Sequence, residues 1–79
     1  MKIQVLGGGC SNCKNLEKTT INALAELNIA ADVEKVQDIQ QIMAFGVMST
    51  PALIINGKVV LSGRVPSIHE LKEIIEKNK

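Results

Sequence analysis

Two cysteines, Cys10 and Cys13, are the residues in this sequence best suited to chemistry. They are separated by Ser11 and Asn12 and follow a glycine run, 7–9, at the predicted start of a helix. The free N–H groups and partial positive charge of a helix N-terminus favour a thiolate, the form of cysteine that attacks disulfides and binds soft metals. Two thiols at this spacing can also close a disulfide within one helical turn. The pair therefore indicates redox exchange or metal binding.

If the pair is redox-active, the two cysteines have different roles. Cys10, at the helix start, is predicted to be the exposed nucleophile. Cys13 lies one turn further in, and we expect it to be shielded and to attack the mixed disulfide that Cys10 forms. Lys14 and Lys18 add a weak positive potential on the same helix, and no acidic residue lies between positions 7 and 14, which also favours a thiolate.

Metal binding is the alternative use of the same pair. Two thiolates suit Cu(I) but leave a tetrahedral Zn site incomplete in a single chain. Copper chaperones also carry a CxxC motif after a first strand, with a methionine two residues before the first cysteine, where this sequence has Gly8. A Cu(I) or Zn protein, including a metal chaperone, therefore stays as the second hypothesis.

The composition narrows the class of protein. The 79 residues are enough for one small domain, predicted to span 1–79, and a net charge of +1 with Phe45 as the sole aromatic residue gives no sign of a nucleic-acid or membrane-surface partner. The apolar start, 1–6, is too short for a signal-peptide core or a membrane span, so we expect a cytoplasmic protein. In a reducing cytosol, a close cysteine pair is more typical of redox or metal chemistry than of a structural disulfide.

The elements that must position the cysteines follow from patterning and turn signals. Asn56-Gly57 between two apolar runs predicts a hairpin, Asp38 is a helix N-cap with Gln41 as its capping-box partner, and Ser67 starts a second capping box. The predicted elements are a strand at 2–6, a helix at 11–27, a strand at 30–36, a helix after Asp38 that ends at Gly46, strands at 52–55 and 58–61, and a final helix after Ser67.

This order, β-α-β-α-β-β-α, predicts an α/β fold with a mixed four-stranded sheet. The first two strands are joined through a helix and should be parallel, the last two form an antiparallel hairpin, and helices cover both faces. In the short helix we expect Ile39, Ile42 and Met43 to be the apolar residues. Met43 and Met48 are interpreted as packing residues that flank the site.

Three features together resemble the thioredoxin/glutaredoxin superfamily. They are the CSNC motif at the first strand–helix junction, the order of the elements, and Thr50-Pro51 opening the hairpin with Gly63 just after it. The chain is most similar to the minimal thioredoxin-like proteins described as small redox-active disulfide proteins, and the resemblance covers essentially its whole length. It implies a thioredoxin-like fold and a thiol–disulfide oxidoreductase.

The resemblance also implies the roles of particular residues. Cys10 and Cys13 match the nucleophile and the resolving cysteine of a redox-active disulfide, and Pro51 matches a cis-proline that lies against them. Thr50 is expected to offer its backbone to an extended substrate segment. The full set of predicted substrate-binding residues is Ser11, Asn12, Thr50, Pro51 and Gly63.

The implied partners are a disulfide-containing protein substrate and a reductase, such as a flavin- and NADPH-dependent thioredoxin reductase. No bound cofactor is expected. The sequence departs from typical thioredoxins in three ways. Gly9 stands where an aromatic residue precedes the first cysteine, and Ser11-Asn12 replaces Gly-Pro between the cysteines. The strand 2–6 also lacks the acidic residue that manages the proton of the second cysteine. A proton relay must therefore use water or another group.

Overall fold

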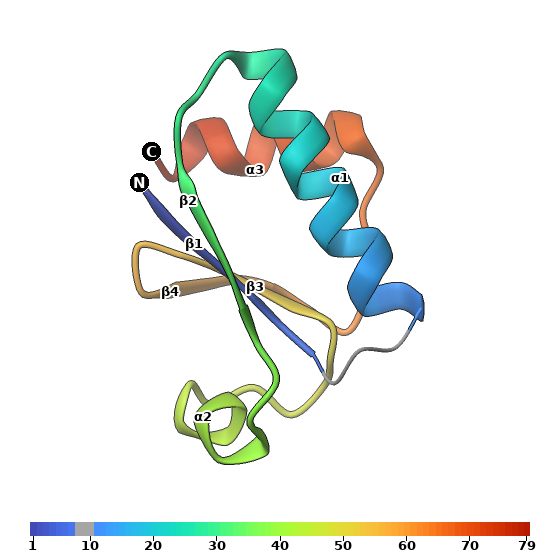
Figure 1. The fold of residues 1–79 in the computed structure, drawn as a ribbon, viewed down its shortest axis with the longest axis vertical. Helices are drawn as coiled ribbons and strands as arrows, with labels where there is room; N and C mark the ends of the chain where they lie inside the picture. Colours follow the sequence, from blue (N-terminus) through green and yellow to red (C-terminus); the bar gives the residue numbers. More distant parts are fainter. Residues whose placement is uncertain (8–10) are drawn as a thin grey trace.

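The computed structural model describes residues 1–7 and 11–79, and its elements follow the predicted order (Figure 1). Asn56 and Gly57 both have positive φ, 51° and 84°, as the predicted tight hairpin turn requires. The elements are β1 (Lys2–Leu6), α1 (Ser11–Leu27), β2 (Asp32–Val36), α2 (Ile39–Ala44), β3 (Ala52–Ile55), β4 (Lys58–Ser62) and α3 (Ile68–Lys77).

The four strands form one mixed sheet in the order β2-β1-β3-β4. β1 and β2 are parallel, as expected of strands joined through a helix, and β3 is antiparallel to both β1 and β4. The register pairs Leu6 with Ala52, so the end of β1 lies beside the start of β3. The end of β1 and the segment that leads into β3 therefore lie at the same end of the sheet.

Each face of the sheet has its own apolar cluster. Because side chains alternate along a strand, Leu53 and Ile55 of β3 pack towards α1 and α3, whereas Ala52 and Ile54 pack with Ile42 of α2 on the opposite face. In Figure 1, α1 and α3 lie together on one side of the sheet and α2 lies apart from them. The predicted placement of helices on both faces is confirmed, and the fold is the mixed α/β arrangement expected of a thioredoxin-like protein.

Local hydrogen bonds set most of the helix and strand ends, and two details differ from the sequence prediction. The Ser67 side chain accepts a hydrogen bond from the Glu70 N–H at 3.2 Å, as predicted for that cap. Asp38 also caps its helix, but its side chain accepts from the Gln40 N–H at 2.9 Å and not from Gln41. The second strand was predicted from residue 30, but pairing with β1 begins at Asp32, opposite Lys2, the first residue of β1.

A larger correction concerns the short helix and the residues after it. Of its predicted apolar residues only Ile42 is buried, whereas Ile39 and Met43 are 70% and 68% exposed and Met48 is 99% exposed. The helix has six residues, so it turns only one narrow face towards the sheet. The interpretation of Met43 and Met48 as packing residues was therefore wrong.

Candidate functional site

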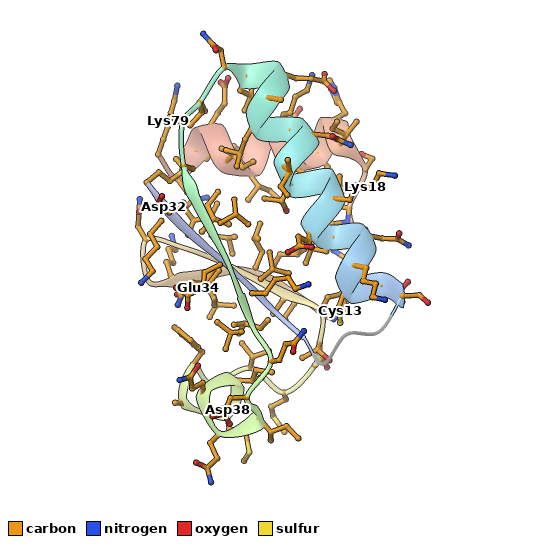
Figure 2. The ribbon with its side chains drawn as sticks, viewed as in Figure 1. Cys13, Lys18, Asp32, Glu34, Asp38 and Lys79 are labelled. Atoms are coloured by element: carbon orange, nitrogen blue, oxygen red, sulfur yellow. The ribbon has the colours of Figure 1, made fainter. Side chains whose placement is uncertain are left out.

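Cys13 lies in the first turn of α1, at the end of the sheet where β1 finishes (Figure 2). Its side chain is only 5% exposed, which confirms that the second cysteine of the motif is shielded, and it is disulfide-bonded. The periodicity of α1 explains the burial, because Leu16 and Thr20 follow Cys13 on the same inward face. Cys10 lies outside the described residues, so its exposure and its pairing with Cys13 stay predictions.

Gly7 lets the end of β1 approach Cys13 closely. A Cβ atom added to Gly7 would lie 2.8 Å from the Cys13 Cβ and closer still to its Sγ. The backbone of Gly7 is held by a hydrogen bond from its N–H to the Val36 carbonyl at 3.0 Å. The lack of a side chain at this position therefore makes room for the Cys13 sulfur.

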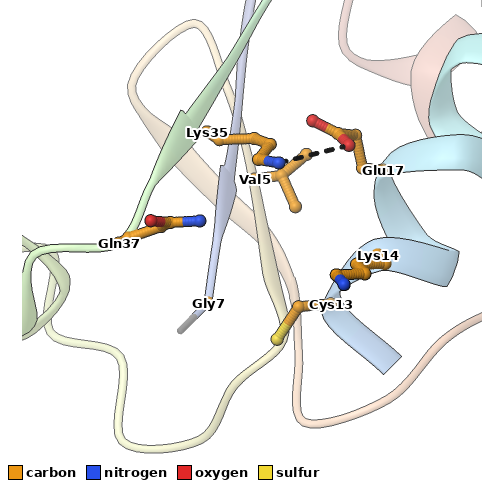
Figure 3. A pocket seen from close by; sticks show the side chains of 7 residues that line it. All are labelled: Val5, Gly7, Cys13, Lys14, Glu17, Lys35 and Gln37. Carbon is orange, nitrogen blue, oxygen red and sulfur yellow. Dashed lines mark ion pairs between the residues drawn. The ribbon is translucent and has the colours of Figure 1, made fainter. Parts of the chain in front are cut away.

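A small pocket opens beside Cys13 and contains charged groups from two elements (Figure 3). Lys14 and Glu17 come from α1, and Lys35 comes from β2. The Lys35 Nζ lies 3.8 Å from a Glu17 carboxylate oxygen. Lys14 was expected to add positive potential near the cysteines, and it does line this pocket. Lys18, the other lysine named for that effect, is exposed on α1 and does not line it.

The segment leading into β3 forms the other side of this end of the sheet. The peptide bond between Thr50 and Pro51 is cis, Pro51 is buried and Thr50 is exposed. The Gly63 N–H donates to the Pro51 carbonyl at 2.8 Å, and Gly63 has a φ of +79°. The structure thus brings together Thr50, Pro51 and Gly63, three of the residues predicted from the sequence. The other two, Ser11 and Asn12, are exposed in the first turn of α1.

A shallow apolar pocket continues from Thr50 onto α2. It has a volume of about 320 Å³, and its lining includes Ile39, Met43 and Met48. These exposed apolar side chains therefore form a surface next to the segment that carries the cis-proline. Their exposure was not predicted, because an apolar residue in a short helix, or in the segment just after it, gives no sequence signal of which way it faces.

An ion pair lies between the segment after β4 and the first turn of α3. Arg64 and Glu70 hydrogen-bond through their side chains, and both groups are exposed. That hydrogen bond lowers the pKa of Glu70 below its ordinary value and raises the pKa of Arg64. The Glu70 backbone N–H also donates a hydrogen bond to the Ser67 side chain, which caps α3. The Arg64–Glu70 ion pair therefore stabilises the start of this helix.

Residues other than the predicted ones also belong to the site. Glu17 and Lys35 line the pocket beside Cys13, yet the sequence analysis gave neither of them a role. Gly7 belongs to the glycine run that was expected to bring the backbone close to the cysteines, and its close approach to Cys13 agrees with that expectation. For Glu17 a signal existed, since it follows Cys13 by four residues and so lies on the same face of α1. That Lys35 belongs to the site could be known only from the position of β2 in the structure.

Within 1–7 and 11–79, no group of three or more His, Cys, Asp or Glu side chains is placed to hold a metal ion. In the same part of the chain, none of the helices has the length and apolar character needed to span a bilayer.

Comparison with known proteins agrees with the architecture. A family model described as a thioredoxin domain matches residues 1–76. A protein named thioredoxin from Methanothermobacter thermautotrophicus is 43% identical over 75 residues, which cover 95% of this chain and 97% of that protein. Another protein named thioredoxin, from Methanocaldococcus jannaschii, is 34% identical over 71 residues, covering 90% of this chain and 81% of that protein.

Proposed function

Because this chain belongs to the thioredoxin domain family, we propose that it is a dithiol thiol–disulfide oxidoreductase that acts on protein disulfides. One observation carries the proposal: Cys13 is buried, disulfide-bonded and placed in the first turn of α1. A buried sulfur is poorly suited to meeting a large substrate, so the proposal gives the first attack to Cys10 and the second to Cys13.

The reaction has two exchange steps. The Cys10 thiolate attacks one sulfur of a substrate disulfide, forming a mixed disulfide and releasing the other substrate sulfur as a thiolate. Cys13 then attacks the Cys10 sulfur, the Cys10–Cys13 bond forms, and the remaining substrate sulfur leaves. The substrate gains two electrons, and the chain loses them. A reductase, such as a flavin-dependent thioredoxin reductase, returns the electrons, so the chain needs no bound cofactor of its own.

The surface around the cis peptide supports a protein substrate. Thr50 is exposed beside the buried Pro51, so we expect its backbone to pair with an extended substrate segment. The exposed Met43 and Met48 continue this surface onto α2. Methionine side chains are flexible and polarisable, and they adapt to apolar partners of different shape.

The test is the redox equilibrium of metal-free protein against glutathione buffers, read by thiol alkylation and mass. We expect a reversible two-electron transition in which Cys10 is alkylated first in the reduced form. The variant Cys13→Ser should accumulate a mixed disulfide with a protein substrate, whereas Cys10→Ser should form none. If the pair does not close in the metal-free protein, and the protein as purified holds stoichiometric metal, the chain is instead a metal-binding protein.

A further inference from the structure

The pocket beside Cys13 contains one carboxylate, and it belongs to Glu17. Glu17 lies one helical turn after Cys13 on α1, so its side chain reaches the same pocket (Figure 3). The pocket has a volume of about 10 Å³, room for about one water molecule. The other charged groups that face it are Lys14 of α1 and Lys35 of β2; β1 contributes no ionisable side chain to it, and Gln37 is neutral.

We propose that Glu17 accepts the proton that the Cys13 thiol loses when it resolves a mixed disulfide, with a water molecule in this pocket between them. The inference rests on the proposed function. As the Cys13 sulfur bonds to the Cys10 sulfur, the bond from Cys10 to the substrate sulfur breaks, and its electron pair leaves on the substrate thiolate. The proton moves from Cys13 to the Glu17 carboxylate. When the reductase reopens the disulfide, Glu17 returns the proton to Cys13.

Burial of the sulfur makes such an acceptor useful. Cys13 is only 5% exposed, so hydroxide and buffer reach its thiol poorly. The Glu17 side chain is 26% exposed, so it borders both the pocket and the solvent and can pass the proton outward. The acid that the strand 2–6 lacks is in this way supplied by α1, the helix that carries Cys13.

Lys35 acts as a positioning residue. Its Nζ lies 3.8 Å from a Glu17 carboxylate oxygen and joins α1 to β2 across the pocket. Without the Lys35 side chain the Glu17 carboxylate is still present, but the ammonium group that orients it is lost. We therefore expect Lys35→Met to slow the resolving step less than loss of the carboxylate does.

The experiment separates the two exchange steps in time. Reduced protein is mixed with one equivalent of a symmetric nitroaryl disulfide, each half of which absorbs visible light when released as a thiolate. Attack by Cys10 releases the first half, and attack by Cys13 releases the second. Near pH 7 we expect Glu17→Gln to slow the second release about 100-fold, at the lower end of general acid–base contributions, and to leave the first unchanged. Above about pH 9.5, where free thiols ionise without help, the two proteins should converge.

Two further variants identify the role of the carboxylate. Glu17→Asp keeps an acceptor on a shorter side chain and should restore most of the rate. The matched control is Glu26→Gln, which removes a glutamate of the same helix that binds Lys72 at 3.1 Å, away from the pocket. This control should behave as the wild type in both releases.

The outcomes distinguish the two proposals. If Glu17→Gln matches the wild type at every pH, or is slowed by the same factor at every pH, Glu17 is not the proton acceptor. If the wild-type protein releases only the first half, Cys13 does not resolve the mixed disulfide, and the proposed function itself fails.

Discussion

Replacing Gly7 with alanine tests how tightly β1 packs against the disulfide. The added methyl group would lie 2.8 Å from the Cys13 Cβ and nearer to its Sγ, whereas ordinary contacts between carbon atoms are about 3.5–4.0 Å. Gly7 does not have a positive φ, so the cost comes from this contact and not from the backbone. Overpacking of this kind costs about 1–3 kcal/mol.

The redox state of Cys13 should change that cost. In the disulfide, the Sγ is held by its bond and cannot rotate away from the methyl group, whereas the free thiol can. We expect Gly7→Ala to destabilise the oxidised form more than the reduced form. A difference of about 1.4 kcal/mol raises the reduction potential by about 30 mV, which makes the disulfide easier to reduce.

Two measurements check this prediction. Urea unfolding, followed by far-UV circular dichroism, gives the stability of each form, and equilibration with glutathione buffers gives the potential. Gly46→Ala is the control, because its added Cβ meets nothing within 4 Å and its φ of +78° strains both forms equally. A Gly7→Ala protein with wild-type stability and potential would refute the reasoning.

Three other perturbations probe the core, the ion pair and the exposed surface. Leu53→Ala empties a fully buried position in a central strand and should lower the free energy of unfolding by about 2–5 kcal/mol in urea titrations; a smaller loss would mean that the site collapses. Arg64 lowers the pKa of Glu70, so the contribution of the pair to stability is present above the unfolded carboxyl range and is lost as the pH falls through the lowered pKa. Arg64→Gln should therefore reduce the urea midpoint at neutral pH but not in acid, and an equal loss at both pH values would contradict this. Met48→Asp alters a side chain that is 99% exposed, so stability should change by less than about 0.5 kcal/mol. Its kcat/KM should fall for a protein disulfide and not for a small one, and an equal effect on both would argue against docking at this surface.

Much of this fold could be predicted from the sequence because it depends on local interactions. The turn at Asn56-Gly57 and the cap at Ser67 depend on residues within a few positions of one another, so short-range chemistry decides them. The burial of Cys13 follows in the same way from helical periodicity. The order of strands and helices, and with it the mixed sheet, came from such signals.

The tertiary structure decided what depends on distant segments meeting. Glu17 and Lys35 belong to a helix and a strand, and only the tertiary fold makes them an ion pair that lines the pocket beside Cys13. Likewise, hydrophobicity alone could not tell that Met48 is exposed, because burial depends on whether another element covers the residue. By itself the sequence determined where the cysteine chemistry sits in the chain, and the fold determined which charged and apolar groups surround it.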